Sequence, residues 1–260
     1  MPVQIWATWF PRDGTPQSFI QGFALDDLEL SARRQTPFHF RIGNNRVEEN
    51  SCRGALQVSG HTISWDLHYR STFRVTLSNK GWIGFSHTPH SDALISGEIT
   101  LDGKRFEGDP LAFGVQGHNC GYRHRNFWRW AHAYFPRPGG PTTLEALVYK
   151  MPFGLTFRKA VLWHGGKQHV FRRLREVPED PDKFEWNFGS VEKHGVRLDA
   201  EFAGSGLSVH RLPYVNTNCS GSFEVVNNSL ARAGVRVAQP DGSVELLETT
   251  TGAVLEMVGP

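Results

Sequence analysis

The sequence predicts an all-β fold built from antiparallel strands. Three observations predict it: strand-like runs bounded by turns, recurring turn pairs, and a scarcity of helical patterns. The runs 61–69, 72–77 and 155–163 are examples of such strands. The turn pairs are Asp102-Gly103, Gly139-Gly140, Gly165-Gly166 and Asp241-Gly242. Many short strands at this spacing favour an antiparallel sandwich or barrel.

One hairpin can be placed closely. The pair Asp102-Gly103 separates the run 97–101 from the run 104–106, and an Asp-Gly pair in that position is typical of a two-residue β-turn. Helical candidates are short, and the best of them covers residues 26–30. The sequence therefore predicts very little helix.

Composition limits the class of protein. The 260 residues suffice for one large domain or two small ones, and 39% apolar residues suffice for a packed core. A formal net charge of +2 argues against a polyanion such as a nucleic acid as partner. No apolar run approaches the ~20 residues of a membrane helix, although peripheral contact with a membrane stays open.

The expected compartment is the cytoplasm. The first residues show no basic segment followed by an apolar one, so they do not resemble a secretory signal. Cys52, Cys120 and Cys219 are scattered and odd in number, which fits a reducing environment without a disulfide framework. The sequence gives no indication of the oligomeric state.

A faint internal repeat suggests two domains. The segment 50–58 has a cysteine, then a glycine two positions on, then a strand-like run, and the segment 218–225 has the same order. We interpret this as two related β units in tandem, with coincidence as the alternative. The predicted domains are residues 1–112 and 113–260, with residues 107–110 as a plausible connector.

The most informative stretch is a glycine-framed polar segment followed by an aromatic strand. Gly117 and Gly121 enclose His118 and Asn119, which predicts a tight loop. In the strand that follows, alternation places four side chains on one face: Trp128, Trp130, His132 and Tyr134. A polar loop beside an aromatic face suits a pocket for a large, weakly polar molecule. The alternative is a bend before an ordinary core strand.

A second polar cluster lies at residues 87–94. His90 and Asp92 are two positions apart, so an extended chain aims both side chains the same way. Asp92 could fix one tautomer of His90, or act as a general acid if it is buried. The alternative is a polar turn in which Asp92 accepts hydrogen bonds from nearby amides.

Two glutamates interrupt otherwise apolar strands. Glu145 lies within the run 143–149 and Glu224 within the run 223–227. Each either points into a lumen or faces water, and ordinary strand alternation favours water. Glu145 is nevertheless a candidate for contact with a substrate.

No cofactor or metal is expected. Six side chains could ligate a metal, but their spacing matches no dedicated site: His87, His90, Asp92, His118, His124 and His132. The chain has neither a Gly-x-Ser-x-Gly nucleophile motif nor a phosphate-binding loop.

The order of several short motifs resembles a known superfamily. The chain resembles the lipocalin-like superfamily of carotenoid hydratase, AttH-type proteins, tocopherol cyclase and Diels–Alderases. The resemblance rests first on the segment 117–121 and on Trp128-Arg129-Trp130, which follows it. The segments 51–54, 90–93 and 219–229 add to the resemblance, which covers residues 45–257. Arg129 stands where carotenoid hydratases have an acidic residue, and Gly117 stands where the loop usually has an acid.

The resemblance implies two tandem lipocalin-like antiparallel units with an apolar ligand cavity at or near their junction. It also implies isomerase, cyclase or hydratase chemistry on a terpenoid-like or polyketide-like substrate, without metal or nucleotide. In this hypothesis His118 or Asp92 donates a proton, Asn119 orients an oxygen, and the indoles of Trp128 and Trp130 stabilise a cation. Four further residues would contact the substrate: His132, Tyr134, His90 and Glu145.

Two other classes stay open. A non-catalytic carrier of a hydrophobic molecule needs the same cavity without an acid. A partner-binding protein would present an exposed apolar patch instead. Ionisable groups along the cavity would favour the enzyme.

Overall fold

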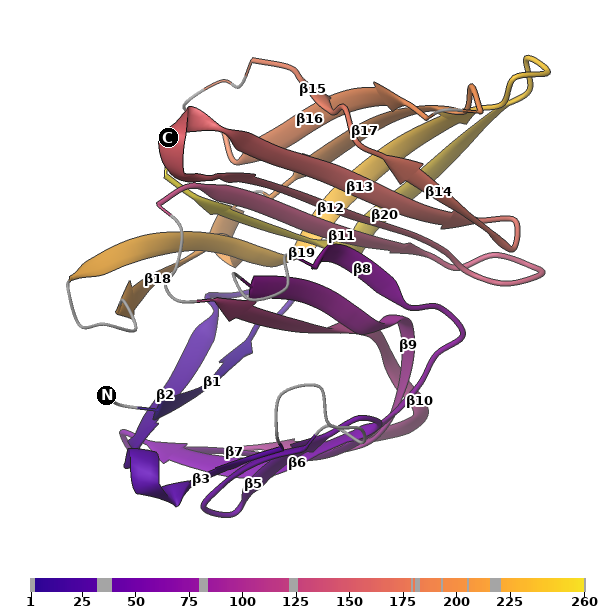
Figure 1. Ribbon diagram of the computed structural model, residues 1–260. Coiled ribbons are helices and arrows are strands. Elements are labelled where there is room, and N and C mark those ends of the chain that lie inside the picture. Colours follow the sequence, from indigo (N-terminus) through magenta and orange to yellow (C-terminus); the bar gives the residue numbers. More distant parts are fainter. Residues whose placement is uncertain are drawn as a thin grey trace. The chain divides into compact units, whose positions relative to one another are not determined.

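The computed structural model describes residues 3–31, 39–79, 84–121, 126–178, 180, 183–192, 194–204, 206–215 and 221–259. Within these residues the regular structure is almost entirely antiparallel β, and the helical segments are three short 3₁₀ turns: Leu25–Asp27, Pro152–Gly154 and Gly206–Ser208. The predicted all-β fold class is therefore confirmed. The chain forms two compact units (Figure 1).

The first unit comprises Met1–Trp9, Gln17–Thr72 and Ala93–Gln116. Its strands are β1 (Val3–Trp9), β2 (Gln17–Phe23), β3 (Leu28–Leu30), β4 (His39–Ile42), β5 (Asn45–Glu48), β6 (Ser51–Val58), β7 (His61–Arg70) and parts of β9 (Gly84–Leu101) and β10 (Lys104–Gly121). The main sheet has the order β10-β9-β7-β6-β5-β4-β3, and β1 pairs with β2. Phe19, Leu56 and Ile63 form its buried core.

The second unit comprises Phe10–Pro16, Phe73–Asp92 and Gly117–Pro260. Its strands are β8 (Val75–Asn79), the first half of β9, β11 (Trp128–Phe135), β12 (Thr142–Lys150), β13 (Thr156–His164), β14 (Lys167–Phe171), β15 (Arg175–Glu176), β16 (Glu185–Val191), β17 (Arg197–Ala203), β18 (His210–Val215), β19 (Ser222–Ala238) and β20 (Val244–Val258). The sheet order is β14-β13-β12-β11-β20-β19-β17-β16-β15, so β20 returns to pair with β11 and the sheet curls on itself (Figure 1).

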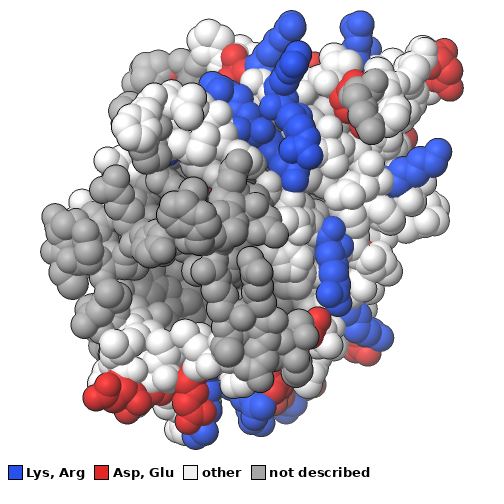
Figure 2. Space-filling model, in the orientation of Figure 1, with Lys and Arg blue, Asp and Glu red and all other residues white. Residues whose placement is uncertain are grey.

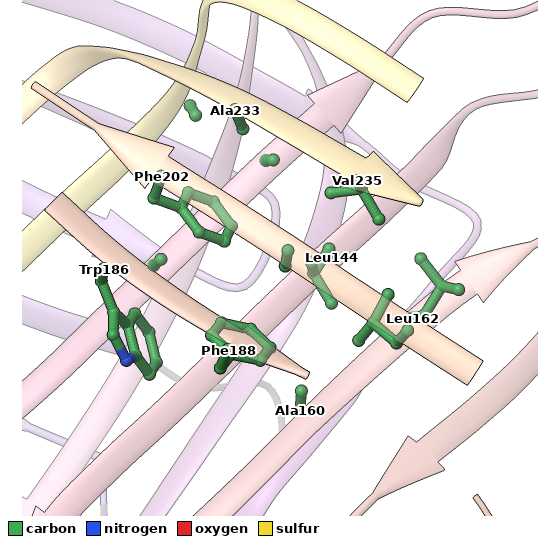
Figure 3. Packing of buried hydrophobic residues seen from close by; sticks show 14 of the residues in the cluster. Leu144, Ala160, Leu162, Trp186, Phe188, Phe202, Ala233 and Val235 are labelled. Carbon is green, nitrogen blue, oxygen red and sulfur yellow. The ribbon is translucent and has the colours of Figure 1, made fainter. Parts of the chain in front are cut away.

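The inner face of this curled sheet holds the largest core. Leu144, Leu162 and Trp186 are fully buried there (Figure 3). The Trp186 ring lies 4.7 Å from the Phe188 ring, centroid to centroid, in a tilted contact. Because successive side chains of a strand point to opposite faces of the sheet, each strand contributes every second side chain to this core.

The hairpin predicted at Asp102-Gly103 is confirmed. β9 and β10 flank it, and both turn residues have positive φ, 47° and 81°. A positive φ at both central positions is what a type I′ hairpin turn requires. The predicted helix at residues 26–30 is wrong, because a single 3₁₀ turn passes directly into β3.

Two predicted irregular segments are strand instead. Residues 107–110, expected as a connector, and residues 117–121, expected as a tight loop, both lie in β10. β10 ends the order of its sheet, and an edge strand tolerates proline and glycine because one row of amides needs no ladder partner. The boundary near residue 112 stays a prediction, and Cys219, in the second copy of the repeat, lies outside the described residues.

None of the helices in the described residues is long and apolar enough to cross a membrane.

The inner core of the second unit gives a stability prediction. Leu162→Ala should lower the free energy of unfolding by about 2–5 kcal/mol, because Leu162 is fully buried and its truncation leaves a cavity. Leu246→Ala is the control, since Leu246 is 68% exposed and should change stability by less than about 0.5 kcal/mol. Urea unfolding followed by tryptophan fluorescence measures both, and equal effects would contradict this assignment of the core.

Candidate functional site

β11 separates two environments. Ala131, Ala133 and Phe135 face the inner core of the second unit. Trp130 belongs to a different cluster, as expected if Trp128, Trp130, His132 and Tyr134 share the opposite face. The predicted alternation of this strand is therefore confirmed.

The aromatic face is covered by a segment from earlier in the chain. Phe73, Val75 and Leu77 pack with Val161 in a small cluster, against which Trp130, Leu147 and Trp163 also pack. The Phe73 ring stacks on the Trp163 ring with 4.4 Å between centroids. β8 and the start of β9 thus place a second layer over this side of the sheet.

Glu145 lies at the centre of this face. It pairs directly with His132 across the β11–β12 ladder and is only 2% exposed. Its Oε1 accepts hydrogen bonds from the hydroxyl of Thr88 at 2.8 Å and from the indole N–H of Trp130 at 3.0 Å. Its Oε2 is buried and has no hydrogen-bond partner in the described residues.

Burial raises the pKa of Glu145 from 4.5 to about 7, because desolvation disfavours the charged carboxylate. The hydrogen bonds from Trp130 and Thr88 and the positive charge of Lys159 oppose this rise but do not cancel it. A carboxyl group with a pKa near neutrality can both donate and accept a proton under ordinary conditions.

His132 is the buried neighbour of Glu145. Its Nε2 lies 2.7 Å from the carbonyl oxygen of Ser91, so Nε2 carries the hydrogen and Nδ1 keeps a lone pair. Burial lowers the pKa of His132 to about 4, against the opposing effects of the Ser91 bond and the Asp92 charge. His132 is therefore a neutral imidazole at neutral pH.

Asp92 and His90 are part of this covering layer, and each is 3% exposed. Asp92 accepts a hydrogen bond from the backbone N–H of Phe73 at 2.9 Å. Its charge helps to raise the pKa of Tyr134, for which burial is the larger cause. Both residues belong to β9, so the alternative of a polar turn at residues 87–94 is wrong.

His118 and Asn119 lie at the end of β10, beside this cluster. Asn119 is exposed and His118 is half-buried. Burial lowers the pKa of His118, and the neighbouring His87 and His90 lower it further. A Cβ atom on Gly117 would lie 3.9 Å from the Thr88 hydroxyl that binds Glu145. Thr88 therefore separates the exposed end of β10 from the buried carboxyl.

The structure brings most of the predicted site residues together, but it changes the place of one. Water exposure, which alternation favoured for Glu145, is wrong because β8 and β9 cover its face of the sheet. Glu224, by contrast, is exposed and pairs with Arg211. Sequence reasoning missed Thr88, although Thr88, His90 and Asp92 recur at every second position of one strand. It also missed Ser91, whose contribution is a backbone carbonyl that no side-chain pattern reveals.

A second tryptophan–carboxylate pair lies on the same face. Trp128 Nε1 donates to Glu256 Oε1 at 2.8 Å, and Asn227 Nδ2 donates to Glu256 Oε2 at 3.4 Å. Glu256 stands opposite Trp130 in the β11–β20 ladder. Burial raises the pKa of Glu256. Burial, and then the charge of Glu256, raise the pKa of Tyr214 to about 12.

A separate cavity of about 1020 Å³ opens in the second unit. Apolar side chains of Phe184, Phe223 and Met257 line part of it, and Arg211 and Glu224 lie at its border. Glu145 and His132 do not line this cavity. In the described part of the chain, no three His, Cys, Asp or Glu side chains are arranged to hold a metal ion.

No model of a known protein family matches the sequence, and no curated protein is significantly similar to it. Among solved structures, the chain is similar to the crystal structure of kievitone hydratase from Nectria haematococca. The TM-score is 0.63, and the match covers 99% of this chain and 80% of that one. Because the sequence identity is 12%, the likeness shows a shared fold.

The buried carboxyl predicts a distinctive pH dependence of stability. Between pH 4.5 and about 7 the unfolded chain loses the Glu145 proton while the folded chain keeps it, so this group lowers stability as the pH rises. Glu145→Gln removes that loss. Between pH 4.5 and about 7, the free energy of unfolding of the variant should rise relative to that of the parent by on the order of 3 kcal/mol.

Urea unfolding at several pH values measures this gain. The depressed pKa of His132 makes stability rise between about pH 4 and 6.5, but this contribution is present in both proteins and cancels in the difference. The exposed Glu248→Gln is the control for loss of a carboxylate. A difference between parent and Glu145→Gln that is the same at pH 4.5 and pH 7.5 would contradict the raised pKa.

Proposed function

We propose that the protein is a cofactor-independent proton-transfer enzyme that acts as a hydratase on a hydrophobic, weakly polar substrate, with Glu145 as the proton donor. The observation that carries this proposal is a buried carboxyl group with one oxygen held by two donors and the other without a hydrogen-bond partner among the described residues. A structural carboxylate in a core would have both oxygens satisfied.

The chemistry follows from the protonation states. Protonated Glu145 donates its proton to an alkene carbon, which leaves a carbocation on the substrate. The indole of Trp130, whose N–H is fixed on the same carboxyl group, would stabilise that cation through its ring face. Water then adds to the cation and releases a proton, so the net reaction is addition of one water across the double bond. The reverse sequence is a dehydration.

His132 suits the base in the water-addition step. Its Nε2 is engaged by the Ser91 carbonyl, and its neutral state leaves Nδ1 able to accept a proton. Asp92 would compensate the imidazolium so formed, since its charge acts on His132. The role of Asn119 in orienting a substrate oxygen or a water stays a prediction.

The lowered pKa of His118 weighs against its charged form as the proton donor at neutral pH. For Glu145 the raised pKa keeps about half of the molecules protonated near pH 7. We therefore assign the acid role to Glu145 in preference to His118. Asp92 is instead assigned a supporting role, since its carboxylate accepts a hydrogen bond from the backbone N–H of Phe73 and its charge acts on His132.

The fold shared with kievitone hydratase is consistent with this class of reaction. The fold alone does not carry the assignment, since one fold supports many chemistries. Kievitone, which that enzyme is named for, and other hydrophobic alkenes are therefore the first substrates to test.

A substrate screen with a carboxyl variant tests the proposal. In water labelled with ¹⁸O, the parent protein should convert at least one alkene of the panel to a product heavier by one labelled water, detected by mass spectrometry. Glu145→Gln should lower turnover by about 10²–10⁴-fold. Glu248→Gln should keep the parental rate. Equal turnover by the parent and Glu145→Gln would exclude Glu145 as the acid.

The pH–rate profile tests the role of Thr88. The rate of the parent should fall above about pH 7 as Glu145 loses its proton. Thr88→Val removes a hydrogen bond to the charged carboxylate, so the falling limb should move up by about one pH unit. Thr143→Val is the matched control, because Thr143 is also buried on this face but contacts Ser91 instead. An unshifted limb in Thr88→Val would show that Thr88 only fills space.

The second candidate function is a carrier of hydrophobic molecules. The cavity of about 1020 Å³, lined partly by Phe184, Phe223 and Met257, favours it because that volume suits an apolar ligand. Native mass spectrometry after incubation with a lipid extract separates the two functions. A ligand recovered unchanged supports the carrier, and a ligand recovered with water gained or lost supports the enzyme.

A further inference from the structure

The segment that follows β14 presents three exposed arginines on an anchored backbone. Arg172, Arg173 and Arg175 are exposed, whereas Phe171 and Leu174 beside them are buried. The hydroxyl of Ser190 donates a hydrogen bond to the backbone carbonyl of Arg173 at 3.0 Å. The backbone is thus fixed from inside the sheet while the guanidinium groups reach solvent.

These arginines line a concave surface site of about 470 Å³. Four of its seven lining residues are arginines. The lining consists of Thr156, Arg158, Arg172, Arg173, Leu174, Arg175 and Glu176. Figure 2 shows basic side chains gathered over the part of the second unit that carries β13, β14 and β15. We call this set of lining residues the arginine pocket.

The single carboxylate of the arginine pocket is already engaged. Glu176 Oε2 lies 3.3 Å from Arg129 Nη1, and Glu176 Oε1 lies 3.8 Å from Arg158 Nε. Within the described residues, no carboxylate forms an ion pair with Arg172, Arg173 or Arg175. Among the described residues, three guanidinium groups of the pocket therefore have no carboxylate as counterion.

The positive charge of Arg172 acts on a lysine outside the pocket lining. Burial, and then the charge of Arg172, lower the pKa of Lys159, whose ammonium group donates a hydrogen bond to the carbonyl oxygen of Thr76. The whole chain has a formal net charge of only +2, so this concentration of positive charge is local. Like charges this close repel one another and cost stability, which an anion bound among them would recover.

We propose that the arginine pocket binds a diphosphate group carried by a small molecule. Guanidinium groups donate paired hydrogen bonds that match phosphate oxygens. A single phosphate carries about −1.5 to −2 charges near neutral pH, fewer than the three unpaired arginines. Two linked phosphates match the charge more closely, and the volume of the pocket accommodates them.

Calorimetry with inorganic pyrophosphate tests the proposal on the full-length protein. The parent should bind pyrophosphate at least tenfold more tightly than phosphate, and added NaCl should weaken binding because the contacts are ionic. Arg172→Gln combined with Arg175→Gln should weaken pyrophosphate binding at least tenfold. The matched control combines Arg53→Gln with Arg197→Gln, which removes two exposed arginines outside the pocket and should leave binding unchanged.

Each opposing result overturns the proposal. Binding that the Arg172/Arg175 variant retains, or no binding by a parent protein whose melting temperature shows it to be folded, excludes a diphosphate site here. Vesicles containing an anionic phospholipid are the second arm, because lipid headgroups share the phosphate chemistry. Binding to vesicles but not to pyrophosphate would assign the pocket to a membrane surface and overturn the small-molecule proposal.

Discussion

The burial of one ionisable side chain sets the design of the second unit. Glu145 stands on β12, on the face turned away from the main core, and residues from β8 and β9 cover it. Removing a carboxylate from water costs several kcal/mol unless it is protonated or fully paired. Here the pairing is half complete, since Thr88 and Trp130 hold only one of the two oxygens. Protonation of Glu145 removes the cost of the incompletely paired charge. The stability of the fold therefore depends on the protonation state of this site.

The two faces of the sheet differ in role: the inner face stabilises the fold, and the outer face carries the ionisable residues. The inner face is a continuous apolar core around Leu144, Leu162 and Trp186, where each side chain is fully buried. The outer face of the same strands carries His132 and Glu145 as a directly opposed pair. Packing on the inner face fixes the positions of β11 and β12. The backbone positions of His132 and Glu145 on the outer face therefore do not depend on the polar contacts of these two side chains.

The sequence predicts one strand of this site well and its cover poorly. Alternation along residues 127–135 is a local property, and it identifies Trp130, His132 and Tyr134 as one face. The burial of Glu145 is not local, because the residues that cover it, such as Val75 and Thr88, precede it by more than fifty positions. A strand covered on both faces is apolar on both, and the run 143–149 is largely apolar around Glu145. A lone charged residue in such a run is nevertheless more often exposed to water, so the pattern favours water. Glycine content misleads in a related way, since the segment 117–121 is extended rather than turned.

The edge of the curled sheet raises a further question about its arginines. Within the described residues no ladder joins β14 to β15, so the sheet has an open edge where the arginine pocket lies. Charged side chains at such an edge discourage pairing with other chains, and this alone would explain some positive charge there. Protection of the edge by charge would work equally well with lysine in place of arginine, and on a flat surface as well as a concave one. Arginine differs from lysine in its planar fork of donors, which matters for an oxyanion and not for simple repulsion. The choice of arginine at Arg172, Arg173 and Arg175, around a hollow with its one carboxylate already paired, therefore favours a ligand over protection of the edge.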